Sequence, residues 1–499
     1  MSSVAGSVGA QSQAQFLGHP RGLSTLFFTE MWERFSYYGM RALLVLFMVD
    51  QIEQGGLAFS DQTATAIYGL YTAAVYLVAL PGGWIADRLT GAQRAVWLGG
   101  IVIMSGHFVL AIPGLGTFFL GLVLVVLGTG LLKPNISAIV GELYGRGDER
   151  RDAGFTIFYM GINIGAALGP LVCGLLARDN WHYGFAAAGV GMLVGLIQFR
   201  ASRAYLGSAG LEPEHAASEG GMRRNAWVGI ALSLSVIGGL LLAGLTGVVR
   251  FDAVLLARGT TYVIAAVGLL YFAYLFLLGG LTPEERGRVV VILALFLAAA
   301  MFWAGFEQAG SSLNLFAERY TIREFGAFQI PAAWFQSLNP IFIIVLAPLY
   351  SMLWVSLARR HLNPAAPLKF AAGLMILGAG FAVMIGAARL VAAGDQVLPT
   401  WLFFTYLLHT MGELALSPVG LSSVSRLAPR RFVGQMMGVW FLAASLGNII
   451  AGLIAGEFRA DAVEEMPGLY LQIVLTTVGS GVLLALCAKP LKRMMGDAR

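Results

Sequence analysis

Apolar stretches of about 20 residues recur along the whole chain and are separated by shorter polar segments. Stretches of this length can cross about 30 Å of hydrocarbon as helices. Because the bilayer core holds no water, backbone amides there must be paired internally, and these runs lack the alternating pattern of barrel strands. The pattern therefore predicts an all-α membrane protein.

The pattern predicts fourteen membrane-spanning helices in three groups. Six precede a polar stretch rich in Gly, Ser and Arg, two follow it, and six more complete the chain. The predicted spans lie near residues 23–49, 63–86, 95–112, 117–141, 153–177, 184–199, 226–249, 260–281, 289–312, 333–357, 370–391, 399–424, 433–456 and 468–488.

Composition and charge agree with this pattern. Hydrophobic residues make up 58% of the 499 and charged residues 12%, which lies outside the usual balance of a soluble domain. With a cytoplasmic N-terminus, 22 of the 32 Lys and Arg fall on the cytoplasmic side and seven on the other. This bias predicts that both termini are cytoplasmic. It also explains the net positive charge of the chain without requiring that the protein binds nucleic acid. Both cysteines lie in apolar runs, so we expect no metal site and no cofactor.

Seven charged side chains fall inside predicted spans, where each costs about 2.5 to 3.5 kcal/mol. They are the cations Arg34, Arg41 and Lys133 and the acids Glu30, Glu33, Glu307 and Glu413. If one carboxyl is protonated the set is neutral, whereas loss of that proton leaves one negative charge at membrane depth. The set favours a proton-coupled site, and the alternative is a group of permanent ion pairs that join helices.

The first predicted span carries the densest polar pattern. Its polar and phenolic residues recur at helical spacing and form one face: Glu30, Glu33, Arg34, Tyr37, Tyr38 and Arg41. Such a face must contact protein or water rather than lipid, so we expect it to line a cavity. A buried structural network is the alternative.

This face reads E-x-x-E-R-F-x-Y-Y-G and resembles a hallmark of the proton-coupled oligopeptide transporter family, within the major facilitator superfamily. The resemblance continues in both halves of the chain, in G-T-G-L-L-K-P-N-I-S around Lys133, F-Y-M-G-I-N-I-G around Asn163, F-W-A-G-F-E-Q-A-G around Glu307, Q-S-L-N-P around Asn339, G-E-L-A-L-S-P-V-G around Glu413 and M-M-G-V-W-F around Trp440. The loop G-W-I-A-D-R-L-T-G-A-Q-R, from Gly83 to Arg94, is similar to a cytoplasmic loop motif of the superfamily.

The resemblance implies the major facilitator fold, two six-helix bundles around a central cavity, with two inserted helices between them. The implied domains are a cytoplasmic polar tail (1–22), the first bundle (23–199), a cytoplasmic linker (200–225), the inserted helices with their cytoplasmic connection (226–288), the second bundle (289–488) and a cytoplasmic basic tail (489–499). One bundle would rock against the other around a site near the midplane.

A short peptide suits the polar residues, because it always carries a carboxylate and an ammonium. Arg34 can form a forked contact with the carboxylate and Lys133 can add a charge. Glu413, with the amide oxygens of Asn163 and Asn339, can hold the ammonium. Five aromatic residues offer broad surfaces that tolerate many side chains, although packing alone would also explain them: Tyr37, Tyr38, Tyr76, Trp303 and Trp440.

Coupling requires a group whose proton affinity changes with conformation, and the resemblance points to Glu307 facing Arg41 across the bundles. Lys133 and Glu413 would form the opposing gate, and Asp87 with Arg88 would latch neighbouring helices. Eukaryotic relatives carry a histidine after a tyrosine on the second helix, but here Tyr68 is followed by Gly69. This departure shifts weight to Glu307 and to the cluster of Glu30, Glu33 and Arg34, and it leaves open which carboxyl binds the proton.

The sequence therefore predicts a monomeric, proton-driven importer of di- and tripeptides in a bacterial inner membrane, and not an enzyme. No phosphate-binding Gly-Lys-Ser/Thr loop supports an ATP-driven pump, and no nucleophile-base or metal-ligand spacing supports an embedded enzyme. Two alternatives stay open. One is transport of another small solute such as nitrate, and the other is a peptide sensor that transports nothing.

Overall fold

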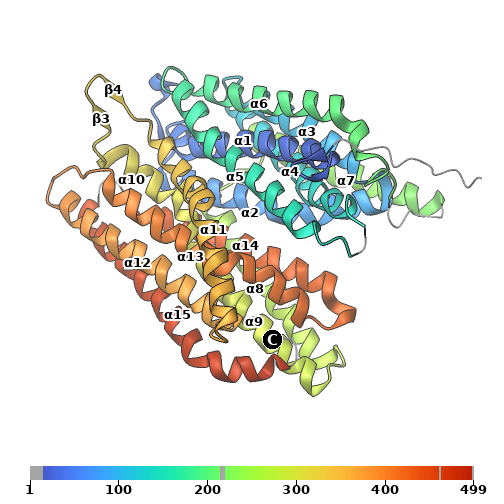
Figure 1. Cartoon of the computed structure of the whole chain (residues 1–499). Helices are drawn as coiled ribbons and strands as arrows, with labels where there is room; N and C mark the ends of the chain where they lie inside the picture. Colours follow the sequence, from blue (N-terminus) through green and yellow to red (C-terminus); the bar gives the residue numbers. More distant parts are fainter. Residues whose placement is uncertain (1–14, 146, 214–219, 460–461, 497–499) are drawn as a thin grey trace, which may run out of the picture.

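The computed structural model of the chain describes residues 15–145, 147–213, 220–459 and 462–496 (Figure 1). Within these ranges, fourteen long helices and one short helix account for most of the regular structure, which confirms the all-α prediction. The helices are α1 (Gly22–Val49), α2 (Asp61–Ile85), α3 (Ala92–Leu110), α4 (Leu115–Glu142), α5 (Arg151–Ala177), α6 (Trp181–Ser202), α7 (Gly220–Leu245), α8 (Ala253–Leu278), α9 (Pro283–Phe306), α10 (Ser312–Tyr320), α11 (Leu338–Arg359), α12 (Ala366–Ala392), α13 (Thr400–Leu427), α14 (Val433–Ala455) and α15 (Met466–Met494).

Twelve helices of the described chain are long and apolar enough to cross a membrane. The two long helices outside this set are α1 and α13, and both carry buried or half-buried charge. Every stretch of α1 long enough to span contains Glu33 and Arg34, and α13 carries Glu413 within a run that also holds hydroxyl side chains. Polar and charged residues therefore lower the hydropathy of these two helices, although Lys133 on α4 and Glu307 are charges within the other spans.

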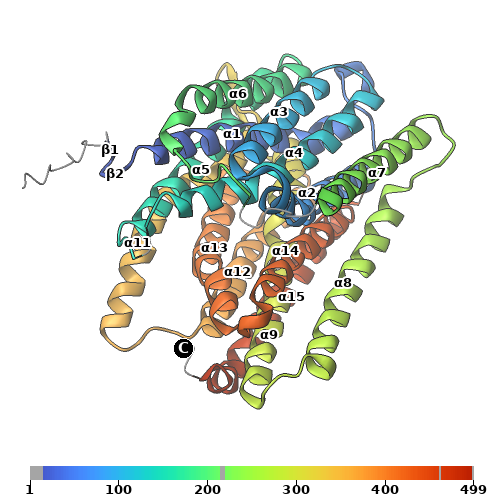
Figure 2. The same cartoon turned by 90° about the vertical axis from the view of Figure 1, so that its right-hand side faces the viewer.

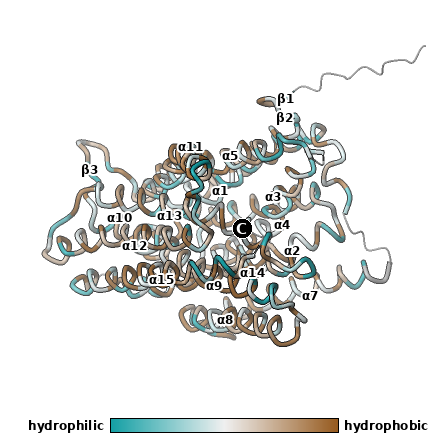
Figure 3. Tube along the Cα trace, turned by 60° about the horizontal axis from the view of Figure 1, so that its bottom comes forward, coloured by the Kyte–Doolittle hydropathy of each residue, from teal (hydrophilic) through white to brown (hydrophobic). Residues whose placement is uncertain are grey.

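The helices form two groups, with a third pair at the side. Helices α1 to α6 pack on one another in one half of Figure 1, and α9 and α11 to α15 pack on one another in the other half. Helices α7 and α8 stand outside both groups (Figure 2), and α8 is hydrophobic along most of its length (Figure 3). This is the predicted arrangement of two six-helix bundles with two inserted helices.

One predicted span is broken in the structure. We expected a continuous helix over residues 289–312, but α9 ends at Phe306 and a 3-10 turn, η4 (Glu307–Gly310), leads into the short helix α10. Ser311 between them has a non-helical backbone, with φ −124° and ψ −97°. The break places Glu307 at a helix end rather than within a regular helix.

Several predicted boundaries also move. The predicted linker at 200–225 is shorter, because α6 and a 3-10 turn, η3 (Arg203–Leu206), occupy its start and α7 occupies its end. Helix α8 begins at Ala253 rather than near residue 260, and α15 continues into the predicted basic tail. Parts of the predicted tails and linker lie outside the described residues, namely 1–14, 214–219 and 497–499, as does Arg146.

The described chain also contains two short antiparallel β-hairpins. One pairs β1 (Gln15–Phe16) with β2 (His19–Pro20), and the other pairs β3 (Glu324–Phe325) with β4 (Phe328–Gln329). The first hairpin packs beside the α4–α5 connection, where Arg150 donates to the Gly18 carbonyl at 3.3 Å. The hydrogen bonds that Arg150 donates to Asp148 lower the pKa of that carboxyl to about 2. The predicted tail thus includes an anchored segment.

Local sequence explains where the helices begin and how closely they pack. At the start of α9, the Thr282 hydroxyl accepts from the Glu285 amide and the Glu285 carboxylate accepts from the Thr282 amide, which forms a capping box with Pro283 in the first turn. Between α2 and α4, a Cβ on Gly82 would collide with the Gly130 carbonyl. Small residues therefore set the spacing within the first bundle.

Candidate functional site

The polar face of α1 is buried inside the protein. Glu33 is fully buried, Arg34 is 3% exposed and Arg41 is 7% exposed. Glu30 and Tyr37 are also buried, whereas the adjoining Tyr38 side chain is half-buried. Helix α1 packs against α5 and α6 within its own bundle and against α10 of the other bundle. Its charged face is therefore separated from lipid.

Glu30, Glu33 and Arg34 form one ion cluster on this face. The Nε atom of Arg34 lies 3.1 Å from Glu30 Oε1 and also pairs with Glu33 Oε2. The Arg34 guanidinium lies 5.2 Å from the centroid of the Tyr37 ring. Three buried atoms of the cluster have no hydrogen-bond partner in the structure, namely Glu30 Oε2, Glu33 Oε1 and Arg34 Nη2. The cluster thus has unused capacity to bind a proton or a polar solute.

Lys133 enters the same region from α4. Its Nζ atom lies 4.4 Å from the centroid of the Tyr76 ring on α2, which is a cation–π distance. It is also close enough to Arg34, Glu33 and Glu30 to interact with them electrostatically. Three helices of the first bundle therefore contribute charge or aromatic surface to one place.

Arg41 and Glu307 join the two bundles. The Nη2 atom of Arg41 forms an ion pair with Glu307 Oε2, and both side chains are at least nine-tenths buried. The Nε atom of Arg41 donates to the Tyr68 hydroxyl at 2.6 Å. This pairing was expected from the family resemblance, whereas the Tyr68 contact was not. Each charge has an oppositely charged partner, and this pairing allows both side chains to be buried between the bundles.

The second bundle contributes an amide and carboxylate group. Asn339 on α11 donates to Glu413 Oε2 at 2.9 Å and to the Thr410 hydroxyl at 3.0 Å, both on α13. In the first bundle, Asn163 on α5 donates to the Tyr159 carbonyl at 2.9 Å. Asn339 thus uses its amide nitrogen in two hydrogen bonds and Asn163 in one, and the amide oxygens are the acceptors that can meet a donor such as an ammonium.

The remaining predicted site residues are two tryptophans of the second bundle and the pair Asp87 and Arg88. Trp303 packs against Phe302 and Phe306, and Trp440 packs against Phe370. Asp87 and Arg88 are exposed on a π-helical turn, η2 (Ala86–Thr90), at the end of α2. Within the described chain, no ion pair within 4.0 Å joins Lys133 to Glu413, whereas Arg41 and Glu307 are paired.

Close backbone packing explains the glycine after Tyr68. At Gly69 on α2, a Cβ would lie 3.2 Å from the Gly452 Cα on α14 and 3.1 Å from the Asn448 carbonyl oxygen. The two bundles therefore meet here through backbone atoms. Any side chain at position 69, a histidine included, would require these backbone atoms to shift by a few tenths of an ångström.

Sequence reasoning missed a second ion pair across the bundles. The Arg319 guanidinium on α10 donates to both carboxylate oxygens of Asp61 on α2, at 2.6 and 2.7 Å. Each residue lies at the end of an apolar run, where charges are ordinary, so neither stood out. The signal available was the spacing of Asp61 and Tyr68, two helical turns apart on one face of α2.

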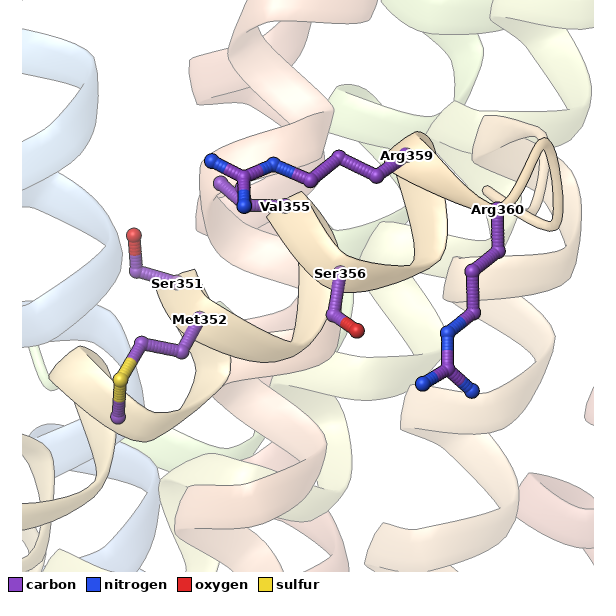
Figure 4. A pocket seen from close by; sticks show the side chains of 6 residues that line it. All are labelled: Ser351, Met352, Val355, Ser356, Arg359 and Arg360. Atoms are coloured by element: carbon purple, nitrogen blue, oxygen red, sulfur yellow. The ribbon is translucent and has the colours of Figure 1, made fainter.

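A hollow of about 520 Å³ lies away from these residues. It adjoins the C-terminal end of α11 and is lined by Ser351, Met352, Val355, Ser356, Arg359 and Arg360 (Figure 4). It shares no residue with the predicted site. Among the described residues, no group of three or more His, Cys, Asp or Glu side chains is positioned to hold a metal ion.

The fold and the site together define a class of protein. Two helical bundles that meet along a seam, with buried charges on the facing helices, are the architecture of a major facilitator transporter.

Comparison with known proteins agrees with this class and narrows it. Residues 93–467 match the model of the POT family. The chain is 44% identical to a peptide transporter, YePEPT, of Yersinia enterocolitica subsp. palearctica, and the match covers 97% of each chain. It is 38% identical to a di-/tripeptide transporter of Lactococcus lactis subsp. cremoris, over 98% of this chain and 99% of that one. A crystal structure of a peptide transporter in complex with sulfate superposes with a TM-score of 0.90, at 42% identity and 97% coverage of both chains. The protein belongs to the POT family.

Proposed function

We propose that this protein imports di- and tripeptides by proton-coupled alternating access. The observation that carries the proposal is the buried Arg41–Glu307 ion pair between the two bundles. Protonation of Glu307 would remove its charge and weaken the pair, so the bundles would separate more easily at that point. Proton binding and opening would then be linked through one carboxyl.

The polar groups match the two ends of a peptide. Arg34 and Lys133 would bind the carboxylate, since Arg34 Nη2 is a buried donor with no partner and Lys133 pairs with no carboxylate within 4.0 Å in the described chain. Glu413 and the amide oxygens of Asn163 and Asn339 would bind the ammonium. Since Arg34 and Lys133 stand on the first bundle and Glu413 stands on the second, a short peptide would bridge the two bundles.

The aromatic residues would form the walls between these ends. Tyr37 and Tyr38 project from the same α1 face as Arg34, and Tyr76 lies beneath Lys133. Trp303 and Trp440 are half-buried on the second bundle. Broad amphipathic surfaces accept varied side chains without fixed hydrogen bonds, which suits a carrier of many peptides.

The pairing pattern supports a conformation that faces the cytoplasm. The Arg41–Glu307 pair is closed, whereas Lys133 and Glu413 are apart. With the N-terminus in the cytoplasm, Arg41 lies toward the outer end of α1 and the open pair lies toward the inner side. We propose a monomer in a bacterial inner membrane with both termini cytoplasmic, in which the bundles rock as units.

The first expected result is that an inside-negative potential or an acidic exterior drives dipeptide accumulation in proteoliposomes. The driving force is about 2.3 kcal/mol per charge per 100 mV, which supports a roughly fortyfold gradient for one net charge moved. Uptake of a labelled dipeptide with and without the imposed gradient measures this.

A protonophore and a competing solute make the test specific. Accumulation that persists unchanged with the protonophore would contradict proton coupling. Excess unlabelled dipeptide should compete with the label and nitrate should not. Binding of dipeptide with no uptake under any gradient would instead indicate a sensor.

A further inference from the structure

Two ion pairs at different depths hold the same seam closed. The inner pair, Arg41 with Glu307, is almost fully buried, with side chains 9% and 3% exposed. The outer pair, Arg319 with Asp61, is partly open to solvent, with side chains 27% and 13% exposed. The outer pair is bidentate, so it fixes the relative orientation of its two helices as well as their separation.

The two pairs are linked on both sides of the seam, through Tyr68 of α2 in the first bundle and through η4 and α10 in the second. Asp61 and Tyr68 lie two turns apart on α2, and the Tyr68 hydroxyl accepts from Arg41 of the inner pair. On the other bundle, Glu307 begins η4 and Arg319 lies near the end of α10, which follows η4 directly. A movement of α10 that separates one pair therefore acts on the other.

Hydrogen bonds hold η4 and α10, the segment between Glu307 and Arg319, to each other and to the neighbouring helices. Ser312 at the start of α10 donates to Gln308 of η4 at 2.5 Å, and Gln308 donates to the Ala451 carbonyl on α14 at 3.1 Å. Asn314 on α10 donates across the seam to the Ala42 carbonyl, beside Arg41, at 2.9 Å. Helix α10 thus contacts the first bundle both near the inner pair and at the outer pair.

We propose that Asp61 and Arg319 form an outer latch that opens in the same step as the Arg41–Glu307 pair and sets how often the seam opens. The inference rests on the alternating access proposed above. The latch needs no titration of its own, because its strength comes from two opposite charges in a bidentate geometry. Its role is to oppose opening until the inner pair is released.

The seam can be measured directly with spin labels at its outer end. Gln54→Cys and Gln396→Cys place labels on exposed loops of the first and second bundles, in a background with Cys487→Ser; Cys173 is buried. Asp61→Asn and Arg319→Gln should each shift the population toward longer label distances by about five- to tenfold. The double variant Asp61→Arg with Arg319→Asp should restore the original distribution to within about twofold.

Two further variants control for the loss of charge and for folding. Glu318→Gln removes an ion pair on the same helix, but Glu318 pairs with Arg323 of the same bundle, so the distances should not change. Asp61→Glu keeps the charge and should resemble the unmodified protein. The measurement requires no peptide transport, so it is independent of whether the proposed substrate is correct. Unchanged distances in both single variants, no recovery in the exchanged pair, or an equal shift in Glu318→Gln would each overturn the latch.

Discussion

Glu307→Gln is expected to abolish proton-driven accumulation of dipeptide while leaving exchange of labelled for unlabelled peptide within a fewfold of normal. Glutamine keeps the shape of Glu307 and its ability to accept a hydrogen bond from Arg41, but it cannot titrate. Exchange needs no net proton movement, so the bundles can still rock with peptide bound. The ratio of inside to outside peptide under an imposed gradient should fall from tens to about one, within the roughly fortyfold limit of a 100 mV potential.

The matched control for this variant is Glu318→Gln. Glu318 lies on the segment that follows Glu307, and its ion pair with Arg323 stays within one bundle. It should keep full accumulation. If Glu307→Gln also accumulates peptide normally, another carboxyl carries the proton, and Glu30 or Glu33 in the cluster with Arg34 would be the next to test by the same substitution.

Lys133→Ala should reduce driven uptake at least about thirtyfold. The substitution removes the cation that would bind the peptide carboxylate, so the carboxylate would be left without this partner in a buried site. The same residue would close the inner gate with Glu413, so exchange should fall together with driven uptake. This joint loss distinguishes it from Glu307→Gln. Rates of both processes in one proteoliposome preparation provide the measurement.

Lys369 is a closely matched control for Lys133. Its Nζ atom lies 4.3 Å from the centroid of the Trp354 ring, almost the same distance as that from Lys133 to Tyr76. Lys369→Ala should keep near-normal uptake, with size-exclusion profiles confirming that both variants fold. Near-normal concentrative uptake by Lys133→Ala would reduce Lys133 to a charge that only pairs helices.

The sequence predicted the features that depend on the cost of charge in a membrane. Arg34 and Glu33 stand out because lipid cannot accommodate them, and the structure buries both. Periodicity then placed them on one face of α1. The helical fold followed from the length of the apolar runs, for a similar reason, because the bilayer leaves the backbone few choices.

The features that sequence did not predict depend on tertiary geometry. The break after Phe306 is not evident from hydropathy, because Glu307 and Gln308 interrupt an apolar run without a proline or other signal that a helix must end there. Lys133 and Glu413 are separated in only one of the two conformations that alternating access requires. The pattern of residues along the sequence does not indicate which conformation is populated. Asp61 was overlooked because a charge at the start of a helix is common, and only the fold brings Arg319 to it.

Packing against the rest of the protein constrains the inserted helices α7 and α8 less than it constrains the helices of the two bundles. None of the span of α7 is buried in the protein, and residues 246–252, which connect it to α8, are all exposed. Since only the hydrocarbon of the bilayer selects the outward side chains of α7, many apolar sequences would serve there equally well. The connection is therefore the place where we expect an inserted epitope or small fluorescent domain to leave the packing of the two bundles undisturbed.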